Sequence, residues 1–139
     1  MRKGQLFNSD VCHVLSKLGH TDCIAIGDAG LPIPDSTQRI DLALTKDIPS
    51  FLQVFNVVST DMQIEKVVLA EEIKQKNPTI HQKILQRIQE VGQLQKNTVM
   101  IEYVPHEEFK QQTAACKAVI RTGECSPYAN IILQSGVFF

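Results

Sequence analysis

Apolar and polar positions follow two different periods along this chain. Between residues 9 and 18 apolar side chains recur at helical spacing, whereas residues 22–27 form a short apolar run between turn-forming residues. The first pattern predicts an amphipathic helix and the second a buried strand. Asn8 is a good N-cap for this helix, and Gly19 is well suited to end it. The chain is therefore expected to begin with a helix followed by a core strand.

The same two periods divide the rest of the sequence. Further strands are predicted at 40–44, 62–70, 98–103, 117–123 and 129–133. Helices are predicted at 49–60, from Pro78 to Val91 and from Pro105 to about residue 115. The segment 62–70 also has a helix-like mixture of acidic and apolar residues, but its β-branched residues favour a strand.

This alternation of strands and helices predicts an α/β fold. We expect a three-layer sandwich, in which a mostly parallel sheet carries helices on both faces. A length of 139 residues without a linker or a shift in composition fits a single domain that spans 1–139.

Composition excludes several classes of function. The formal net charge is −1 and the basic residues are dispersed, so no basic face for nucleic acid is expected. No apolar run approaches the roughly 20 residues that cross a bilayer, and no export signal follows Met1, so we expect a cytoplasmic protein without a membrane partner. The cysteines lack C-x-x-C spacing, which predicts reduced, mostly buried thiols and no metal site.

Two ionisable residues flank the predicted strand at 22–27. His20 precedes it and Asp28 follows it, where ligands are held in many open α/β sheets. An imidazole exchanges protons near neutral pH and a carboxylate accepts hydrogen bonds, so the pair can act on hydroxyl groups without a metal or cofactor. Each residue also has a purely structural interpretation. A histidine near a helix C-terminus favours the helix dipole, and Asp28-Ala29-Gly30 is a plausible turn.

Other polar residues are weaker candidates. His106 falls in the first turn of a predicted helix, and Tyr128 and Asn130 can exchange hydrogen bonds with hydroxyl groups. A surface histidine, a packed core tyrosine and a strand-edge asparagine are equally compatible with these positions. Glu71 and Glu72 are adjacent and point in different directions, so joint acid/base work is not expected of them.

Several collinear segments resemble the family of ribose pyranases and fucose mutarotases, and within it the ribose branch. They are Asn8-Ser9-Asp10, Leu18-Gly19-His20-Thr21-Asp22, Asp28-Ala29-Gly30-Leu31-Pro32-Ile33-Pro34, Ala70-Glu71-Glu72-Ile73 and the stretch 123–133. The resemblance covers essentially the whole chain. It implies a cofactor-independent intramolecular isomerase of carbohydrate metabolism, which interconverts β-D-ribopyranose and β-D-ribofuranose in ribose catabolism. It further implies a cytoplasmic, ring-shaped homodecamer with sites near subunit contacts.

The resemblance also implies residue roles. The proton donor corresponds to His20, and D-ribose is bound by residues that correspond to Asp28, His106, Tyr128, Ala129 and Asn130. Two alternatives stay open on the residues alone: a mutarotase for fucose or another sugar, and a non-catalytic sugar-binding accessory module. Independently, the apolar end Gly136-Val137-Phe138-Phe139 predicts contact with another copy of the chain.

Overall fold

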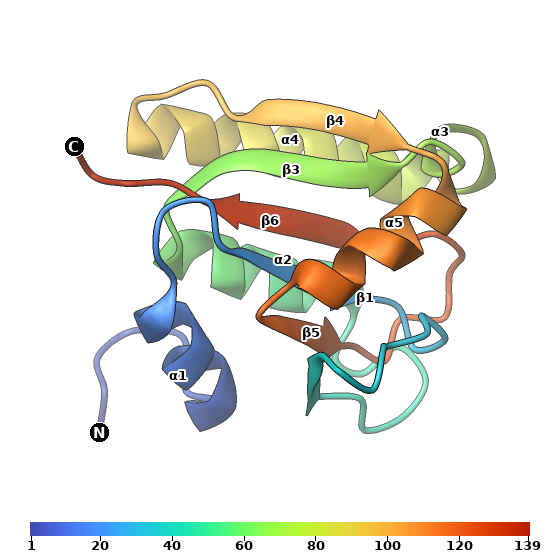
Figure 1. Ribbon diagram of the computed structural model, residues 1–139, viewed down its shortest axis with the longest axis horizontal. Helices are drawn as coiled ribbons and strands as arrows, with labels where there is room; N and C mark the ends of the chain where they lie inside the picture. Colours follow the sequence, from blue (N-terminus) through green and yellow to red (C-terminus); the bar gives the residue numbers. More distant parts are fainter.

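The computed structural model describes residues 1–139, whose strands form one six-stranded sheet in the order β2-β5-β1-β6-β3-β4. The strands are β1 Cys23–Gly27, β2 Gln38–Asp41, β3 Ile64–Ala70, β4 Met100–Val104, β5 Ala118–Arg121 and β6 Ile131–Ser135. Only β6 runs antiparallel to its neighbours, β1 and β3, and every other neighbouring pair is parallel. In Figure 1 the arrow of β6 accordingly points against those of β3 and β4. The prediction of a mostly parallel sheet is confirmed.

Helices lie on both faces of this sheet. They are α1 Ser9–Lys17, α2 Phe51–Asp61, α3 Ile73–Lys76, α4 Pro78–Gln95 and α5 His106–Gln112, and a short 3₁₀ turn, Thr113–Ala115, follows α5. Successive residues of β1 serve different cores, since Ile24 and Ile26 pack with α1, α2 and α4, whereas Ala25 packs with Phe109 of α5. Figure 1 shows α5 in front of the sheet and α2 and α4 behind it. The predicted three-layer arrangement is therefore confirmed.

Side-chain caps fix where several helices begin. Asn8 accepts a hydrogen bond from the Val11 N–H at the start of α1, and Asn77 caps α4 ahead of Pro78. At α2, the Ser50 side chain accepts from the Gln53 N–H while the Gln53 side chain accepts from the Ser50 N–H. Such a reciprocal capping box satisfies two backbone donors that have no partner within the helix.

Replacing Ser50 with alanine is expected to lower the free energy of unfolding by about 1 kcal/mol, because the Gln53 N–H loses its acceptor. Chemical denaturation of both proteins measures the change. Ser36→Ala, at an exposed position, is the matched control and is expected to be neutral within about 0.5 kcal/mol. Equal losses in the two variants would contradict the capping role.

Three local features differ from the expected pattern. Gly19 follows the end of α1 as predicted, but the chain already becomes extended at Leu18, and the left-handed residue is Thr21, with φ 68°. The second strand is Gln38–Asp41 rather than 40–44, since its pairing with β5 ends at Asp41 and the following residues turn. The residues after β3 form the short helix α3, which the apolar pattern did not predict.

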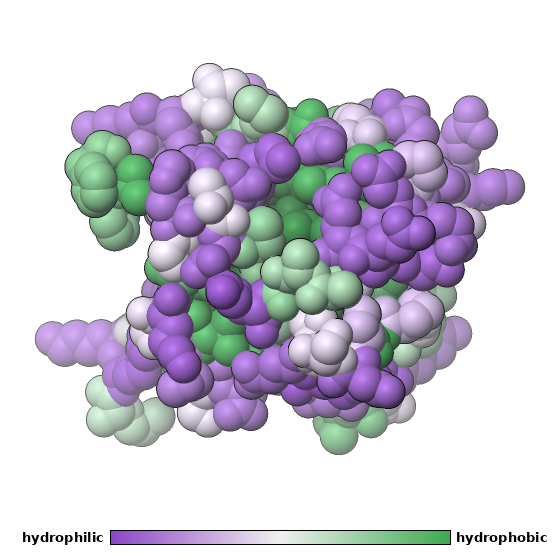
Figure 2. All heavy atoms as spheres, viewed as in Figure 1, coloured by the Kyte–Doolittle hydropathy of each residue, from purple (hydrophilic) through white to green (hydrophobic).

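The structure shows how the surface and the cysteines compare with the expectations from composition. Hydrophilic residues cover most of the face in Figure 2, with hydrophobic patches between them, and Phe138 and Phe139 are fully exposed. All four cysteines are free thiols, but only Cys116 is buried and Cys125 is exposed, so the prediction of mostly buried thiols is wrong. Burial raises the pKa of Cys116 to about 12. None of the helices combines the length and the apolar character needed to cross a membrane.

Candidate functional site

Asp28 and Asn130 form a reciprocal pair at the edge of the sheet where β1 ends. The Asp28 N–H donates to Asn130 Oδ1 at 2.8 Å, and Asn130 Nδ2 donates to Asp28 Oδ2 at 3.0 Å. Because β6 is antiparallel to β1, the start of β6 lies at this same edge and brings Asn130 beside Asp28. Asn130 is buried, so its amide is held in a single orientation by these contacts.

The backbone before Asp28 requires a glycine. A Cβ atom on Gly27 would lie 2.6 Å from Leu31 Cδ2 and 3.2 Å from Asn130 Oδ1. After it, Asp28 Oδ1 accepts a hydrogen bond from the Gly30 N–H at 2.9 Å, so the turn predicted for this segment is present as well. Burial raises the pKa of Asp28, and the hydrogen bonds from Gly30 and Asn130 offset only part of that rise.

His106 and Tyr128 stand at the same edge with their rings in edge-to-face contact. Their ring centroids are 5.0 Å apart at 89°, and the His106 ring also stacks on Phe109 at 6.3 Å. The Glu72 carboxylate accepts the His106 N–H at 3.0 Å and so fixes the start of α5. His106 Nδ1 is buried without a hydrogen-bond partner, which leaves Nε2 as the nitrogen that a ligand can reach.

The segment that carries Tyr128 is tightly anchored. Tyr128 adopts φ 57°, an uncommon conformation for a bulky residue, and its carbonyl accepts the Asn130 N–H at 2.9 Å. Asn77, the cap of α4, donates to the Pro127 carbonyl at 2.9 Å. Ala129, the residue after Tyr128, is completely buried in the larger core.

His20 lies at the opposite edge of the sheet. The Thr21 N–H donates to the carbonyl of Ser135, the last residue of β6, whereas Asn130 precedes the first residue of that strand. The five residues of β1 separate the two edges by roughly 16 Å at about 3.3 Å per residue. Within one chain His20 and Asp28 therefore do not meet, because the extended strand between them holds them apart.

At its own edge His20 has a carboxylate partner. His20 Nε2 lies 2.9 Å from Glu65 Oε2, and Glu65 Oε1 accepts a hydrogen bond from Gln134 Nε2 at 2.7 Å. The imidazole is 54% exposed, so one side of the ring is open to a ligand or to another protein surface. Sequence analysis did not find Glu65, and it did not connect Glu72 with His106, because contacts between residues far apart in the sequence leave no local pattern.

The adjacent carboxylates of Glu71 and Glu72 point to different partners, as expected. Glu71 forms an ion pair with Lys74 at 2.8 Å, whereas Glu72 holds the His106 N–H. The two carboxylates therefore share no partner.

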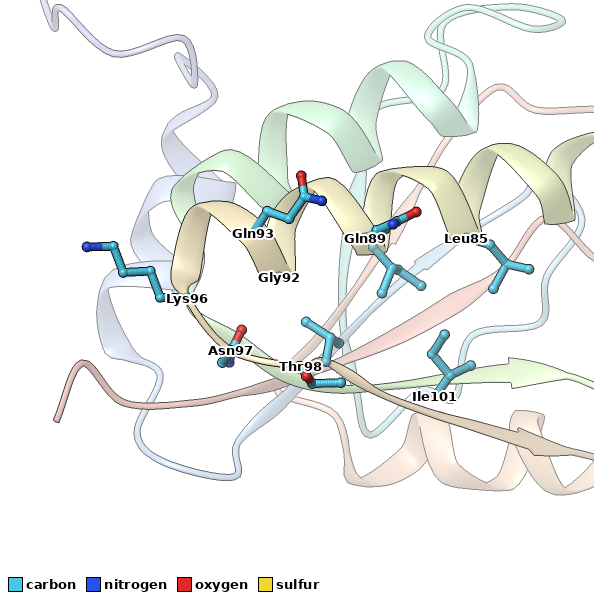
Figure 3. Close-up of a pocket in the computed structure, with 10 residues that line it drawn as sticks. Leu85, Gln89, Gly92, Gln93, Lys96, Asn97, Thr98 and Ile101 are labelled. Atoms are coloured by element: carbon cyan, nitrogen blue, oxygen red, sulfur yellow. The ribbon is translucent and has the colours of Figure 1, made fainter.

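A large hollow on the surface lies away from all of these groups, between α4 and the strand β4 (Figure 3). It occupies about 620 Å³, and the hollow beside Asp28 occupies about 320 Å³. The lining residues of the larger hollow are Leu85, Ile88, Gln89, Gly92, Gln93, Lys96, Asn97, Thr98, Val99 and Ile101. This lining contains no imidazole or carboxylate, the groups that proton transfer to a sugar would use.

The cluster at the carboxyl edge suits a polyhydroxylated ligand. Asp28 supplies an anionic acceptor, Asn130 an amide, His106 an imidazole and Tyr128 a phenol with an aromatic edge. These groups are small, polar and held by neighbouring contacts, and such a set distinguishes ligands by the positions of their hydroxyl groups. Fold and cluster together define an α/β protein whose polar cluster has the chemistry to bind a small hydroxylated molecule.

Comparison with known proteins places the chain among sugar-processing proteins. Residues 1–138 match the RbsD / FucU transport protein family, and the chain belongs to this family. D-ribose pyranases from Escherichia coli strains, among them O1:K1 / APEC, are 58% identical over 139 residues, with full coverage of both chains. This confirms the family that the sequence segments indicated.

Solved structures agree with that assignment. The structure of Bacillus subtilis RbsD complexed with D-ribose has a TM-score of 0.91 and 45% identity, with full coverage of both chains. The fucose mutarotase from Streptococcus pneumoniae in complex with L-fucose has a TM-score of 0.78 and 26% identity, covering 94% of this chain and 93% of its own.

Proposed function

We infer that this chain is an isomerase that interconverts β-D-ribopyranose and β-D-ribofuranose. The observation that carries this inference is the 58% identity to D-ribose pyranases over the full length of both chains. The likeness to a structure complexed with D-ribose supports the same substrate. The polar cluster around Asp28 supplies hydrogen-bonding groups that complement the hydroxyls of a pentose.

The reaction needs only proton transfer. The anomeric hydroxyl of the pyranose loses its proton, the bond from C1 to the ring oxygen breaks, and its electron pair remains on that oxygen, which gains a proton. The resulting open-chain aldehyde recloses when a different hydroxyl attacks C1, loses its proton, and the carbonyl oxygen is protonated. No electron leaves the sugar, so a placed acid/base group, worth about 10²- to 10⁴-fold, together with positioning of the oxygens is sufficient.

We propose that residues at one edge of the sheet bind the sugar and that a residue at the opposite edge exchanges the proton. His20 is the proton donor, and Asp28, His106, Tyr128, Ala129 and Asn130 bind the sugar. The cluster at the carboxyl edge accounts for binding, since its members are held by mutual contacts. The exposed imidazole of His20 accounts for proton exchange.

A complete site then requires two copies of the chain. His20 and the Asp28 cluster lie at opposite edges of one sheet, so His20 of one copy serves the cluster of the next. A contact between two different surfaces repeats from copy to copy and closes into a ring when the rotation permits. We propose a cytoplasmic homo-oligomer of single domains spanning 1–139, a ring-shaped homodecamer, whose apolar contacts include the exposed Phe138 and Phe139.

The activity is tested by saturation-transfer NMR on β-D-ribose. The protein is expected to accelerate exchange between the pyranose and furanose signals above the rate in buffer. Calorimetric binding of ribose without any accelerated exchange would instead identify a non-catalytic sugar-binding module.

A fucose mutarotase is the second candidate, because the Streptococcus pneumoniae enzyme in complex with L-fucose shares this fold at 26% identity. Anomer exchange and ring-size exchange pass through the same open-chain aldehyde. A side-by-side panel of ribose, fucose and other sugars separates the two functions, and faster exchange with fucose than with ribose would favour the second.

Ribose binding is expected to weaken as the pH falls through the raised pKa of Asp28, because protonation removes an anionic acceptor. Folding responds with the opposite sign. Since the folded pKa lies above the unfolded value of about 3.9, protonation favours the folded state. That stabilisation is fully present below the unfolded pKa and is lost as the pH rises through the folded one. Calorimetric titration with ribose and thermal unfolding, each between about pH 4 and 7, measure the two effects.

Asp28→Asn is the matched control for this pH dependence, since it removes the titrating group at the same position. It is expected to bind ribose weakly at every pH and to lose the change in affinity. The same pH dependence in both proteins would show that another group is responsible.

A further inference from the structure

We propose that Glu65 is a positioning residue for His20: it holds Nε2 of the imidazole and so makes Nδ1 the atom that exchanges protons with the sugar. This inference rests on the proposed function of His20 and deepens it. Glu65 touches no residue of the Asp28 cluster in the same chain, since it lies at the edge where β3 begins. Its effect therefore passes through the imidazole.

The hydrogen bonds around Glu65 determine which nitrogen of His20 is protonated. Oε2 lies 2.9 Å from His20 Nε2, and Oε1 accepts from Gln134 Nε2 at 2.7 Å. The hydrogen bond from Gln134, followed by that from His20, lowers the pKa of Glu65, so the carboxylate is ionised near neutral pH. An ionised carboxylate only accepts, so Nε2 must donate. In neutral His20 the free lone pair is then on Nδ1.

Two backbone irregularities meet at this contact. Ile64 pairs with Ser135 and Lys66 with Gln134, so Glu65 is an extra, unpaired residue in β3. Bulges of this kind redirect a side chain and are common beside active sites. On the other side of the contact, Thr21 has φ 68°, which is rare for a β-branched residue. The chain departs from regular structure on both sides, and the result is that His20 and Glu65 meet.

The neighbouring charges are engaged elsewhere. Lys66 pairs with Glu102 at 3.0 Å, and Asp22 faces Lys117 at 3.5 Å. Cys23, whose pKa is raised by burial, is the other titratable group close to Glu65. Glu65 is therefore the anion that contacts the imidazole directly. When Nδ1 takes the proton of the anomeric hydroxyl, the imidazolium forms beside this anion, and Nδ1 later returns the proton to a sugar oxygen.

Glu65→Ala and Glu65→Gln separate the hydrogen bond from the charge. Alanine removes both and is expected to lower kcat for ring exchange about 10- to 100-fold, the loss typical when a metal-ligating histidine loses its carboxylate partner. KM for ribose is expected to stay within about twofold, because the sugar is bound by the other edge. Glutamine keeps an oxygen that accepts from Nε2 and is expected to restore most of kcat. In both variants the pH–rate profile is expected to differ from that of the unaltered protein, because the imidazolium formed during exchange no longer has the Glu65 anion beside it.

Glu102→Gln is the matched control, because it removes the same charge from the neighbouring strand. It is expected to leave kcat and the pH–rate profile unchanged. Thermal unfolding identifies any variant that does not fold, and Glu65→Gln preserves the size of the side chain if Glu65→Ala fails. A kcat and pH–rate profile equal to those of the unaltered protein in both Glu65 variants would overturn the proposal. A rise in KM with unchanged kcat would overturn it as well.

A spectroscopic measurement separates this proposal from the proposed function. Solid-state NMR of sedimented protein labelled with ¹⁵N-histidine reports which ring nitrogen of His20 is protonated, with His20→Gln used to assign the signal. Protonated Nε2 is expected, and protonated Nδ1 in the neutral ring would overturn the proposal. Absence of ring exchange in the unaltered protein would refute the proposed function, whereas the ¹⁵N signal would still decide the Glu65 contact.

Discussion

Replacing His20 with alanine is expected to slow pyranose–furanose exchange of ribose by about 10²- to 10⁴-fold, the usual contribution of a placed acid/base group. The fold should persist, because the imidazole is 54% exposed and its hydrogen bond is to Glu65 at the surface. Saturation-transfer NMR at saturating ribose measures the rate, and thermal unfolding checks the fold.

His13→Ala is the matched control for this variant, since His13 is an exposed histidine on α1. It is expected to exchange ribose at the rate of the unaltered protein. An unchanged exchange rate in a folded His20→Ala protein would reject the proton-donor role. Equal losses in both variants would point to the stability of α1 rather than to catalysis.

Mixing two inactive variants is expected to restore activity. In His20→Ala subunits the binding cluster is intact, and in Asp28→Asn subunits the proton donor is intact. Because the two residues lie at opposite edges of the sheet, a site formed between the two kinds of subunit regains both. Random assembly of equal amounts into rings makes about one quarter of the sites complete. Asp28→Asn alone is expected to lose about 10- to 100-fold through the charge-assisted hydrogen bond.

The measurement is ring exchange after the two variants are unfolded together, refolded and compared with each variant refolded alone. Activity near one quarter of that of the unaltered protein would support a shared site. A mixture that gives only the mean of the two variants would show that each chain builds its own site. The double variant His20→Ala/Asp28→Asn, mixed with the unaltered protein, is the control for the refolding step.

Helix-capping residues and the periodicity of apolar positions were sufficient to predict most of the secondary structure. Asn8 and Asn77 mark helix starts that the structure confirms, because a capping side chain acts within three residues of its own position. The strands β1, β3 and β6 were predicted within a few residues, since burial on both faces makes them short apolar runs. The strand β2 was misplaced because its end is set by pairing with β5 rather than by its own alternation.

For the candidate site, the residues were identified but not their arrangement. His20, Asp28, His106, Tyr128 and Asn130 were named from residue type and from segments that resemble a known family. The structure places all of them except His20 at one edge of the sheet. The contact of Glu65 with His20 and that of Glu72 with His106 were not predicted, because the partners lie 45 and 34 positions apart in the chain.

The sequence by itself determined the order of the elements, the three-layer class and the chemical groups available to a sugar. These properties depend on periodicity, capping and side-chain type, which act over a few residues. Tertiary structure alone decided that the rings of His106 and Tyr128 meet, that Glu65 in a bulge of β3 contacts the imidazole of His20, and that β6 brings Asn130 to Asp28. Those relations depend on strand direction and register, which are fixed by long-range pairing and burial rather than by any local segment.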